Sequence, residues 1–149
     1  MRIPYLQASD TTDQQPGVTT PVQITMDTTD ESKGITHSGG TVTVVEAGVY
    51  FIVAAVQSGE TNTAAINHDV WMRKSDTDIP NSNTRYNIKS TTDSVVLVAQ
   101  VAIRLAIGDT IKVYQSIDTT GKGAGAQATA PAGESKIPSI IFTMYKISD

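Results

Sequence analysis

The stretch Val49-Tyr50-Phe51-Ile52-Val53-Ala54-Ala55-Val56 carries an apolar or aromatic side chain at every position and directly follows Gly48. β-Branched and aromatic residues of this kind favour an extended strand. A strand with one face in water alternates apolar with polar residues, whereas an unbroken apolar strand is covered on both faces. This stretch therefore predicts a strand whose two faces are both buried in the working molecule.

Two other segments share this property, 94–99 and 140–145, whereas the rest of the chain from Val22 onward mostly alternates apolar with polar residues between closely spaced turns. That pattern is typical of many short strands, and no segment of helical period exceeds two turns. We therefore expect an all-β, two-sheet sandwich. One face of each doubly apolar strand meets the opposite sheet. No helix is expected to cover the other face, so a second copy of the chain is the economical cover.

The overall composition limits the classes of function. The 149 residues suit a single domain, and the absence of cysteine excludes disulfides and thiolate metal sites. A net charge of −4, with 11 scattered Lys and Arg residues, argues against nucleic acid as the main partner. No stretch reaches the roughly 18 apolar residues that a membrane span needs, and no secretory signal is expected at the start.

The beginning of the chain is expected to lie outside the folded domain. Residues 1–20 are predicted to form an extended N-terminal arm, because 9–17 is polar and contains Pro and Gly, and the domain is placed at 21–149. The apolar residues of this arm are predicted to anchor it on a partner; they are Ile3, Tyr5 and Leu6.

A second irregular stretch, 117–135, is poor in large apolar residues and rich in Gly and Ala. We expect it to form a long surface loop between the last two strands. Loops of this length are uncommon in compact domains and often carry function.

Two segments resemble the complement globular-head and tumour-necrosis-factor-like (TNF-like) jelly rolls. Glu46-Ala47-Gly48-Val49-Tyr50-Phe51 is similar to the strand-entry motif of that family, and Leu105-Ala106-Ile107-Gly108-Asp109-Thr110-Ile111-Lys112-Val113 is similar to its Leu-x-x-Gly-Asp-x-Val-x-Val step. The match covers roughly residues 22–147, and its order and spacing are more specific than either piece. The resemblance implies a TNF-like jelly roll that forms a homotrimer, with the three doubly apolar segments in an inner sheet around the threefold axis.

The resemblance also implies a set of residues for the trimer interface. They are Tyr50, Ile52, Ala54, Val96, Val98, Phe142 and Met144. Which parity of each strand faces the axis stays open at this point, because both faces of these strands are apolar.

A narrower resemblance is to small virion proteins of tailed phages. Residues 71–84 and 131–141 are similar to segments of those chains. This implies a structural function on a bacteriophage particle: a trimeric capsid decoration (cement) protein, made in the bacterial host cytoplasm, that binds the major capsid protein or neighbouring virion proteins. The alternative is a receptor- or glycan-binding trimeric knob of a tail fibre or adhesin.

The sequence offers little for catalysis or for a cofactor. The two histidines, His37 and His68, lie in unrelated segments, whereas catalytic zinc needs three protein ligands. Acidic residues gather in loops without a calcium-binding pattern, and Gly121-Lys122-Gly123 lacks the spacing and the following helix of a phosphate-binding loop. We therefore expect no enzyme, no metal and no cofactor. Trp71, the single tryptophan, is either a ligand-stacking platform or, more simply, part of the core or an interface.

Overall fold

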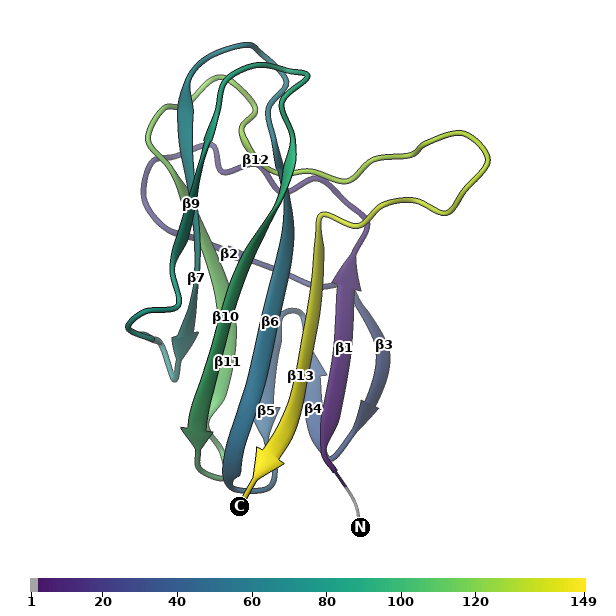
Figure 1. Ribbon diagram of the computed structural model, residues 1–149, viewed down its shortest axis with the longest axis vertical. Coiled ribbons are helices and arrows are strands. Elements are labelled where there is room, and N and C mark those ends of the chain that lie inside the picture. Colours follow the sequence, from purple (N-terminus) through teal and green to yellow (C-terminus); the bar gives the residue numbers. More distant parts are fainter. Residues whose placement is uncertain (1–2) are drawn as a thin grey trace.

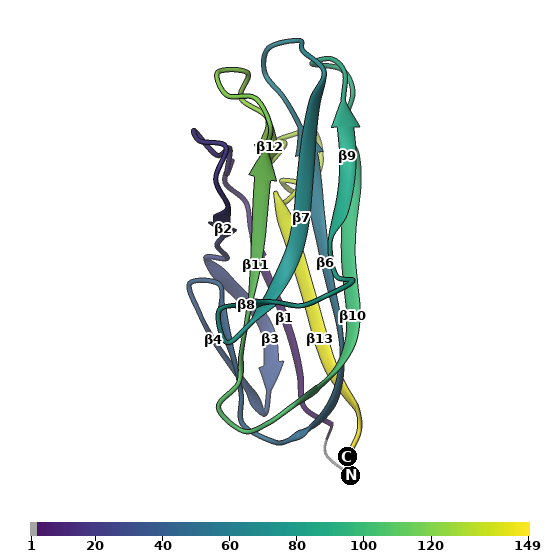
Figure 2. The same cartoon turned by 90° about the vertical axis from the view of Figure 1, so that its left-hand side faces the viewer.

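The computed structural model describes residues 3–149, and within them the regular structure consists of strands alone. Two antiparallel sheets pack face to face as an elongated sandwich (Figures 1 and 2). The strands are β1 Tyr5–Asp10, β2 Val22–Ile24, β3 Thr28–Lys33, β4 Ile35–Ser38, β5 Thr41–Val44, β6 Gly48–Gly59, β7 Ile66–Lys74, β8 Thr77–Asp78, β9 Thr84–Ile88, β10 Val95–Leu105, β11 Thr110–Ile117, β12 Gly125–Ala126 and β13 Ile140–Ser148.

The first sheet, called sheet A, has the strand order β10-β6-β13-β1-β3, with the short β12 paired to the end of β6. The three segments with two apolar faces are therefore the adjacent strands β10, β6 and β13, as the sequence predicted. Sheet B has the order β4-β5-β11-β7-β8, with β2 beside β11 and β9 beside β7. The alternating segments at Val22, Val42 and Ile111 all lie in sheet B.

The core lies between the sheets and is made by every second residue of each strand. In sheet A these include Tyr50, Ile52 and Phe142, and in sheet B Val113 and Met72, all fully buried. Cross-sheet burial of this kind is the main source of stability in a sandwich. A smaller apolar cluster closes the end of the sandwich near β12; its members are Ile66, Ile88, Ile117 and Ala124.

The turn between β10 and β11 explains why the Leu-x-x-Gly-Asp pattern is useful here. Gly108 adopts a φ of 89°, which a side chain would disfavour, and its amide donates to the carbonyl of Val44. The Asp109 carboxylate accepts a hydrogen bond from the amide of Ala106 at 2.8 Å. That bond lowers the pKa of Asp109, and the nearby Lys74 adds to the effect. The motif therefore closes a tight turn that aligns strands of different sheets.

The expected N-terminal arm is wrong for residues 5–10, which form strand β1 inside sheet A. This strand is hydrogen-bonded to β13 on one side and to β3 on the other. Leu6 is 1% exposed and Ala8 is fully buried, so the domain begins well before residue 21. The prediction took the polar residues Ser9 and Asp10 as part of a solvent-exposed arm. In the structure both are buried, where the chain turns across the end of the sandwich.

The long stretch after β11 is a surface loop only in part. Residues 124–126 are buried, because β12 pairs with β6 and the amide of Gln14 bonds to the carbonyl of Ala126. Residues 118–121 are exposed, and so are most of residues 129–137, here called the finger, which project sideways from the body beside β13 and β1 (Figure 1). The backbones of Thr129 and Ile137 exchange two hydrogen bonds, of 3.0 and 2.7 Å, and so close its base.

The placement of β1 gives a first prediction. Leu6→Ala should lower the free energy of unfolding by about 2–5 kcal/mol, because it leaves a cavity between the sheets. Urea or thermal unfolding followed by circular dichroism measures the change. Val18→Ala, in the exposed segment before β2, is the control and should change stability by no more than about 0.5 kcal/mol. Equal effects of the two substitutions would contradict the burial of β1.

Candidate functional site

The side of sheet A that faces away from sheet B carries an extended apolar surface. Because residues along a strand alternate between faces, the fully buried even-numbered residues of β6 leave Val49, Phe51, Val53 and Ala55 pointing outward. The same alternation applies to the neighbouring strands. This outer surface, called the apolar face, consists of Val49, Phe51, Val53, Ala55, Val96, Val98, Ala102, Ile141, Thr143, Tyr145 and Tyr5.

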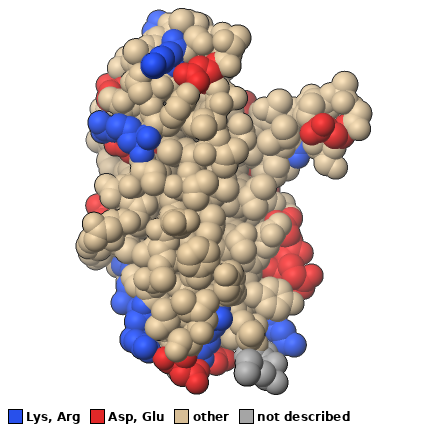
Figure 3. Space-filling model, in the orientation of Figure 1, with Lys and Arg blue, Asp and Glu red and all other residues tan. Residues whose placement is uncertain are grey.

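The strand register arranges these side chains in rows across the sheet. One row runs Val98–Ala55–Ile141, and another runs Ala102–Phe51–Tyr145–Tyr5. In the second row the rings of Phe51 and Tyr145 lie 5.8 Å apart at 57°, a favourable tilted aromatic pair. Between them lies a row of uncharged residues, Gln100–Val53–Thr143–Gln7. From β10 to β1 these three rows hold no charged residue, and Figure 3 shows the centre of this side free of charge; on the outer strand β3 two of the rows end in Lys33 and Glu31.

The structure corrects most of the residues expected at the trimer interface. Those that are fully buried between the two sheets are Tyr50, Ile52, Ala54, Phe142 and Met144. They have no surface to offer a second copy, so the parity chosen for β6 and β13 was wrong. Val96 and Val98 do point outward, with 53% and 37% of their surface exposed, and remain predicted interface residues.

Of the three arm residues predicted to bind a partner, one is buried and two are at the surface. Leu6 is buried in the core and cannot contact a partner without unfolding. Ile3 is exposed, and Tyr5 is partly exposed at the end of the aromatic row. Tyr5 therefore belongs to the apolar face itself and not to a free arm.

Strand β10 forms one edge of sheet A, because in the described part of the chain it is paired along β6 only. It is 11 residues long and mostly apolar on both faces. A long, apolar edge strand offers unpaired backbone groups to any other chain, and proteins normally cover or charge such an edge. Here Arg104, near one end, supplies the one charge within the strand.

Charged groups border the apolar face at the end where β6 begins and β10 and β13 end. The Lys146 ammonium lies 2.7 Å from carboxylate oxygens of both Glu46 and Asp149, and these contacts raise its pKa, that of Asp149 most. The guanidinium of Arg104 donates to the backbone carbonyl of Asp149 at 3.1 Å. These groups satisfy one another, so the rim adds little net charge to the face.

The two histidines lie on different strands of sheet B and face different surroundings. His37 on β4 accepts a hydrogen bond from the amide of Gly40 and contacts the hydroxyl of Thr29. His68 on β7 is completely buried between the hydroxyl of Ser58, at 2.7 Å, and the side-chain oxygen of Gln115, at 2.9 Å. Strands β5 and β11 separate the two, so the structure does not bring them into one site.

The buried His68 is part of a polar network that ties the end of the sandwich together. Gln115 also donates to the carbonyl of Gln14 and accepts from the amide of Ala126, which joins the segment before β2 to β12. Desolvation lowers the pKa of His68, although the bond to Gln115 and the charge of Asp69 oppose this. The histidine is therefore neutral near pH 7, and the network joins β6, β7, β11, β12 and the segment before β2.

Three of the acidic residues in the loops and turns have local partners. Asp76 pairs with Lys112 at 2.8 Å, Asp78 pairs with Arg73 at 2.6 Å, and Asp118 accepts from the amide of Asn67. Within residues 3–149, no three His, Asp or Glu side chains gather as they would around a metal ion. In the same residues no helix is long and apolar enough to cross a membrane.

Comparisons with known proteins show the fold. No family model and no curated protein matches the chain. Among solved structures, murine APRIL at pH 5.0 is 12% identical with a TM-score of 0.64, over 98% of this chain and 100% of that one. The globular domain of zebrafish complement 1qA is 15% identical with a TM-score of 0.65, over 98% of each chain. The chain therefore has the TNF-like jelly-roll fold, as its sequence motifs indicated.

The buried histidine predicts a pH dependence of stability. The pKa of His68 is lowered in the folded chain and near 6.5 in the unfolded chain, so below about pH 6.5 the unfolded state binds more protons. The free energy of unfolding should therefore fall as the pH drops from 7 to 5. In His68→Gln this slope should shrink, whereas His37→Gln, at a half-buried site, should keep most of it. Urea unfolding at fixed protein concentration across this range measures the slope. An unchanged slope in His68→Gln would show that His68 is not the source of the pH dependence.

Proposed function

We propose that the chain is a non-enzymatic structural protein of a bacteriophage particle: a homotrimeric decoration protein that binds and braces the head. The observation that carries the proposal is the apolar face of sheet A next to the uncovered edge of β10. Contiguous apolar surfaces of this extent are rare on soluble monomers and mark sites of association. In this proposal the apolar face binds a second copy of the same chain.

The relative position of face and edge favours a closed ring. The edge of β10 and the surface over β13 and β1 differ, so a contact between them is heterologous, and it leaves one copy with a free face and the other copy with a free edge. Such contacts end only when a ring closes. Three copies close it with the β10 edge of each lying on the apolar face of the next, and the rows of Phe51 and Val98 then surround the axis.

Burial of the apolar face favours assembly. Complete burial of a Val, Ile or Phe side chain stabilises by about 1.5–3 kcal/mol relative to exposure. Each copy holds several that are partly exposed, with Val96, Ile141 and Tyr145 the most accessible on the face. Burial of these side chains works in favour of association, against a cost of about 4–15 kcal/mol for lost translational and rotational freedom. The uncharged polar row of Gln100 and Gln7 can bond across the interface without burying a charge.

Attachment to a particle is assigned to the finger. Residues 131–141, which resemble small tailed-phage virion proteins, form most of the finger and the start of β13. The finger projects beyond the body, is closed at its base by two backbone hydrogen bonds, and is largely exposed (Figure 1). A trimer carries three of them, so weak contacts at each add through effective concentration. The tip of the finger therefore provides the contact with the capsid in this proposal.

The trimer can be tested in solution. The wild-type protein at micromolar concentration should have three times the chain mass by light scattering or sedimentation. Val98→Lys and Tyr145→Lys place charges in the apolar face and should weaken association by about a hundredfold or more, because an unpaired charge would be buried. Both residues are exposed in one copy, so the variants should keep the strand spectrum. Ile107→Lys, in the exposed turn after β10, is the control and should stay trimeric. A soluble wild-type monomer would exclude the proposal.

The location on a particle is tested by reconstitution. Trimers in which 130–136 is replaced by a short glycine linker should stay trimeric but lose most binding to phage heads stripped of the native protein. Co-sedimentation measures the bound fraction, and cryo-electron microscopy of the reconstituted particle should show threefold density on the head. Density at the tail tip would favour the receptor-binding knob, and unchanged binding of the shortened trimer would exclude the finger as the contact.

A further inference from the structure

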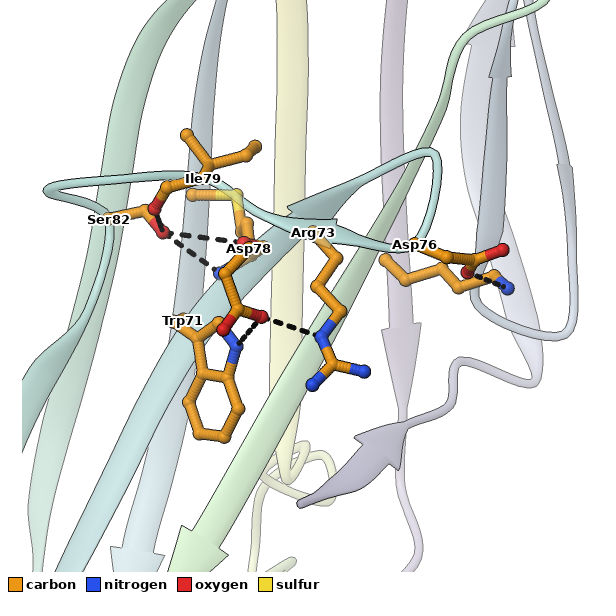
Figure 4. Close-up of polar contacts among 8 residues, drawn as sticks. Trp71, Arg73, Asp76, Asp78, Ile79 and Ser82 are labelled. Carbon is orange, nitrogen blue, oxygen red and sulfur yellow. Dashed lines mark hydrogen bonds and ion pairs between the residues drawn. The ribbon is translucent and has the colours of Figure 1, made fainter.

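The outer side of sheet B, opposite to the apolar face, contains a cavity of about 310 Å³. It is lined by residues of β7, of β11 and of the segment from β8 to β9; Figure 4 shows three of them, Trp71, Asp78 and Ile79. Its lining consists of Asp69, Trp71, Asp78, Ile79, Pro80, Asn83 and Ser116. Sites for small ligands begin at about this size. Because the cavity opens away from sheet A, it stays accessible when the apolar face is covered.

The wall formed by the segment after β8 is held in one shape. The amide of Ile79 donates to the carbonyl of Met72 at 2.9 Å, and the buried Ser82 hydroxyl donates to the carbonyl of Ile79 at 2.8 Å. Ser82 also accepts from the amide of Met72 (Figure 4). Asn81 between them has a φ of 65°, a conformation that persists only where neighbouring contacts fix it. A ligand therefore meets a preformed wall.

The charges in the cavity cancel in pairs. One oxygen of Asp78 accepts from the Trp71 indole at 2.8 Å and from the Arg73 guanidinium at 2.6 Å, as Figure 4 shows. Asp69 accepts two hydrogen bonds from Arg85, at 2.7 and 2.9 Å. The bond from Arg73 lowers the pKa of Asp78, so this carboxylate is ionised, and the positive charge of Arg73 balances its negative charge. The cavity thus has no net charge with which to select an ion.

The remaining groups combine hydrogen bonding with apolar surface. Asn83 and Ser116 line the cavity, and neither side chain bonds to another protein group in the part of the chain that the structure describes. The carboxylates keep lone pairs for further donors. Trp71, Ile79 and Pro80 add apolar walls. A purely apolar ligand would leave these polar groups unpaired, whereas a sugar ring presents hydroxyls to them and C–H groups to the apolar walls.

We propose that this cavity binds a neutral saccharide, as one hexose ring of a glycan, through Asp69, Asp78, Asn83 and Ser116 against the edge of Trp71. The proposal needs one copy of the chain and is independent of where the trimer sits. In a trimer three such cavities face outward, so modest affinity at each produces firm attachment to a surface that carries many sugars.

The single tryptophan makes the test direct, because its fluorescence reports on this cavity alone. Glucose, galactose, mannose and N-acetylglucosamine are titrated into the full-length protein up to about 50 mM, beyond the millimolar range of weak binding. Emission and calorimetry are followed in parallel. At least one sugar should give a saturable response by both methods, with one dissociation constant.

Variants place the ligand in the cavity. Asn83→Ala and Ser116→Ala together should weaken binding by about tenfold or more, whereas the pair Asn62→Ala and Ser94→Ala, exposed residues outside the cavity, should leave it unchanged. Unchanged melting temperatures show that the variants are folded. The absence of a saturable response to every sugar overturns the proposal, as does binding that is insensitive to Asn83 and Ser116. Calcium or phosphate that binds there more tightly than any sugar also overturns it. The oligomeric state, measured on the same samples, separates a failure here from a failure of the trimer.

Discussion

The fold depends on the two-sided hydrogen bonding of β6 and on the burial of one of its faces between the sheets. This strand pairs with β10 along one edge and with β13 along the other, through nearly its whole length. Its even-numbered side chains fill the core, and its odd-numbered side chains form the centre of the apolar face. A change in β6 therefore acts on the core and on the apolar face together, and this strand carries almost no polar residue before Gln57.

The two sheets divide the tasks of the molecule. The centre of sheet A presents an uncharged, largely apolar outer surface, whereas sheet B presents ion pairs, aromatic stacking and a polar cavity. The stacked rings of Trp71 and Tyr114, with Arg73 4.0 Å above Tyr114, show how sheet B uses its aromatic residues. The rings of Trp71 and Tyr114 contact charged groups at the surface, whereas the rings of Phe51 and Tyr145 on sheet A pack against each other on the apolar face.

The sequence predicted the fold class, the identity of the central strands and the absence of long helices, because these follow from periodicity and turn chemistry. It did not predict strand parity in β6 and β13, since both faces are apolar and no single residue decides between them. A signal existed in the few polar residues of these strands. Gln57, Gln100 and Thr143 all lie on the outer side, and their parity identifies Phe51 and Tyr145 as surface residues. Strand β1 was missed because it is short and half polar, and only its tertiary neighbours define it.

The pairing of β1 with β13 brings the start of β1 and the end of β13 to the same pole of the sandwich (Figure 1). The amide of Lys146 bonds to the carbonyl of Pro4, so a short linker from Asp149 would turn β13 and β1 into an ordinary hairpin. The finger then becomes a natural place to open the chain, because its residues are exposed and its base is already fixed by backbone bonds. The order of the strands along the gene is therefore separable from their order in space, and a circularly permuted protein can keep the same core and the same outer face.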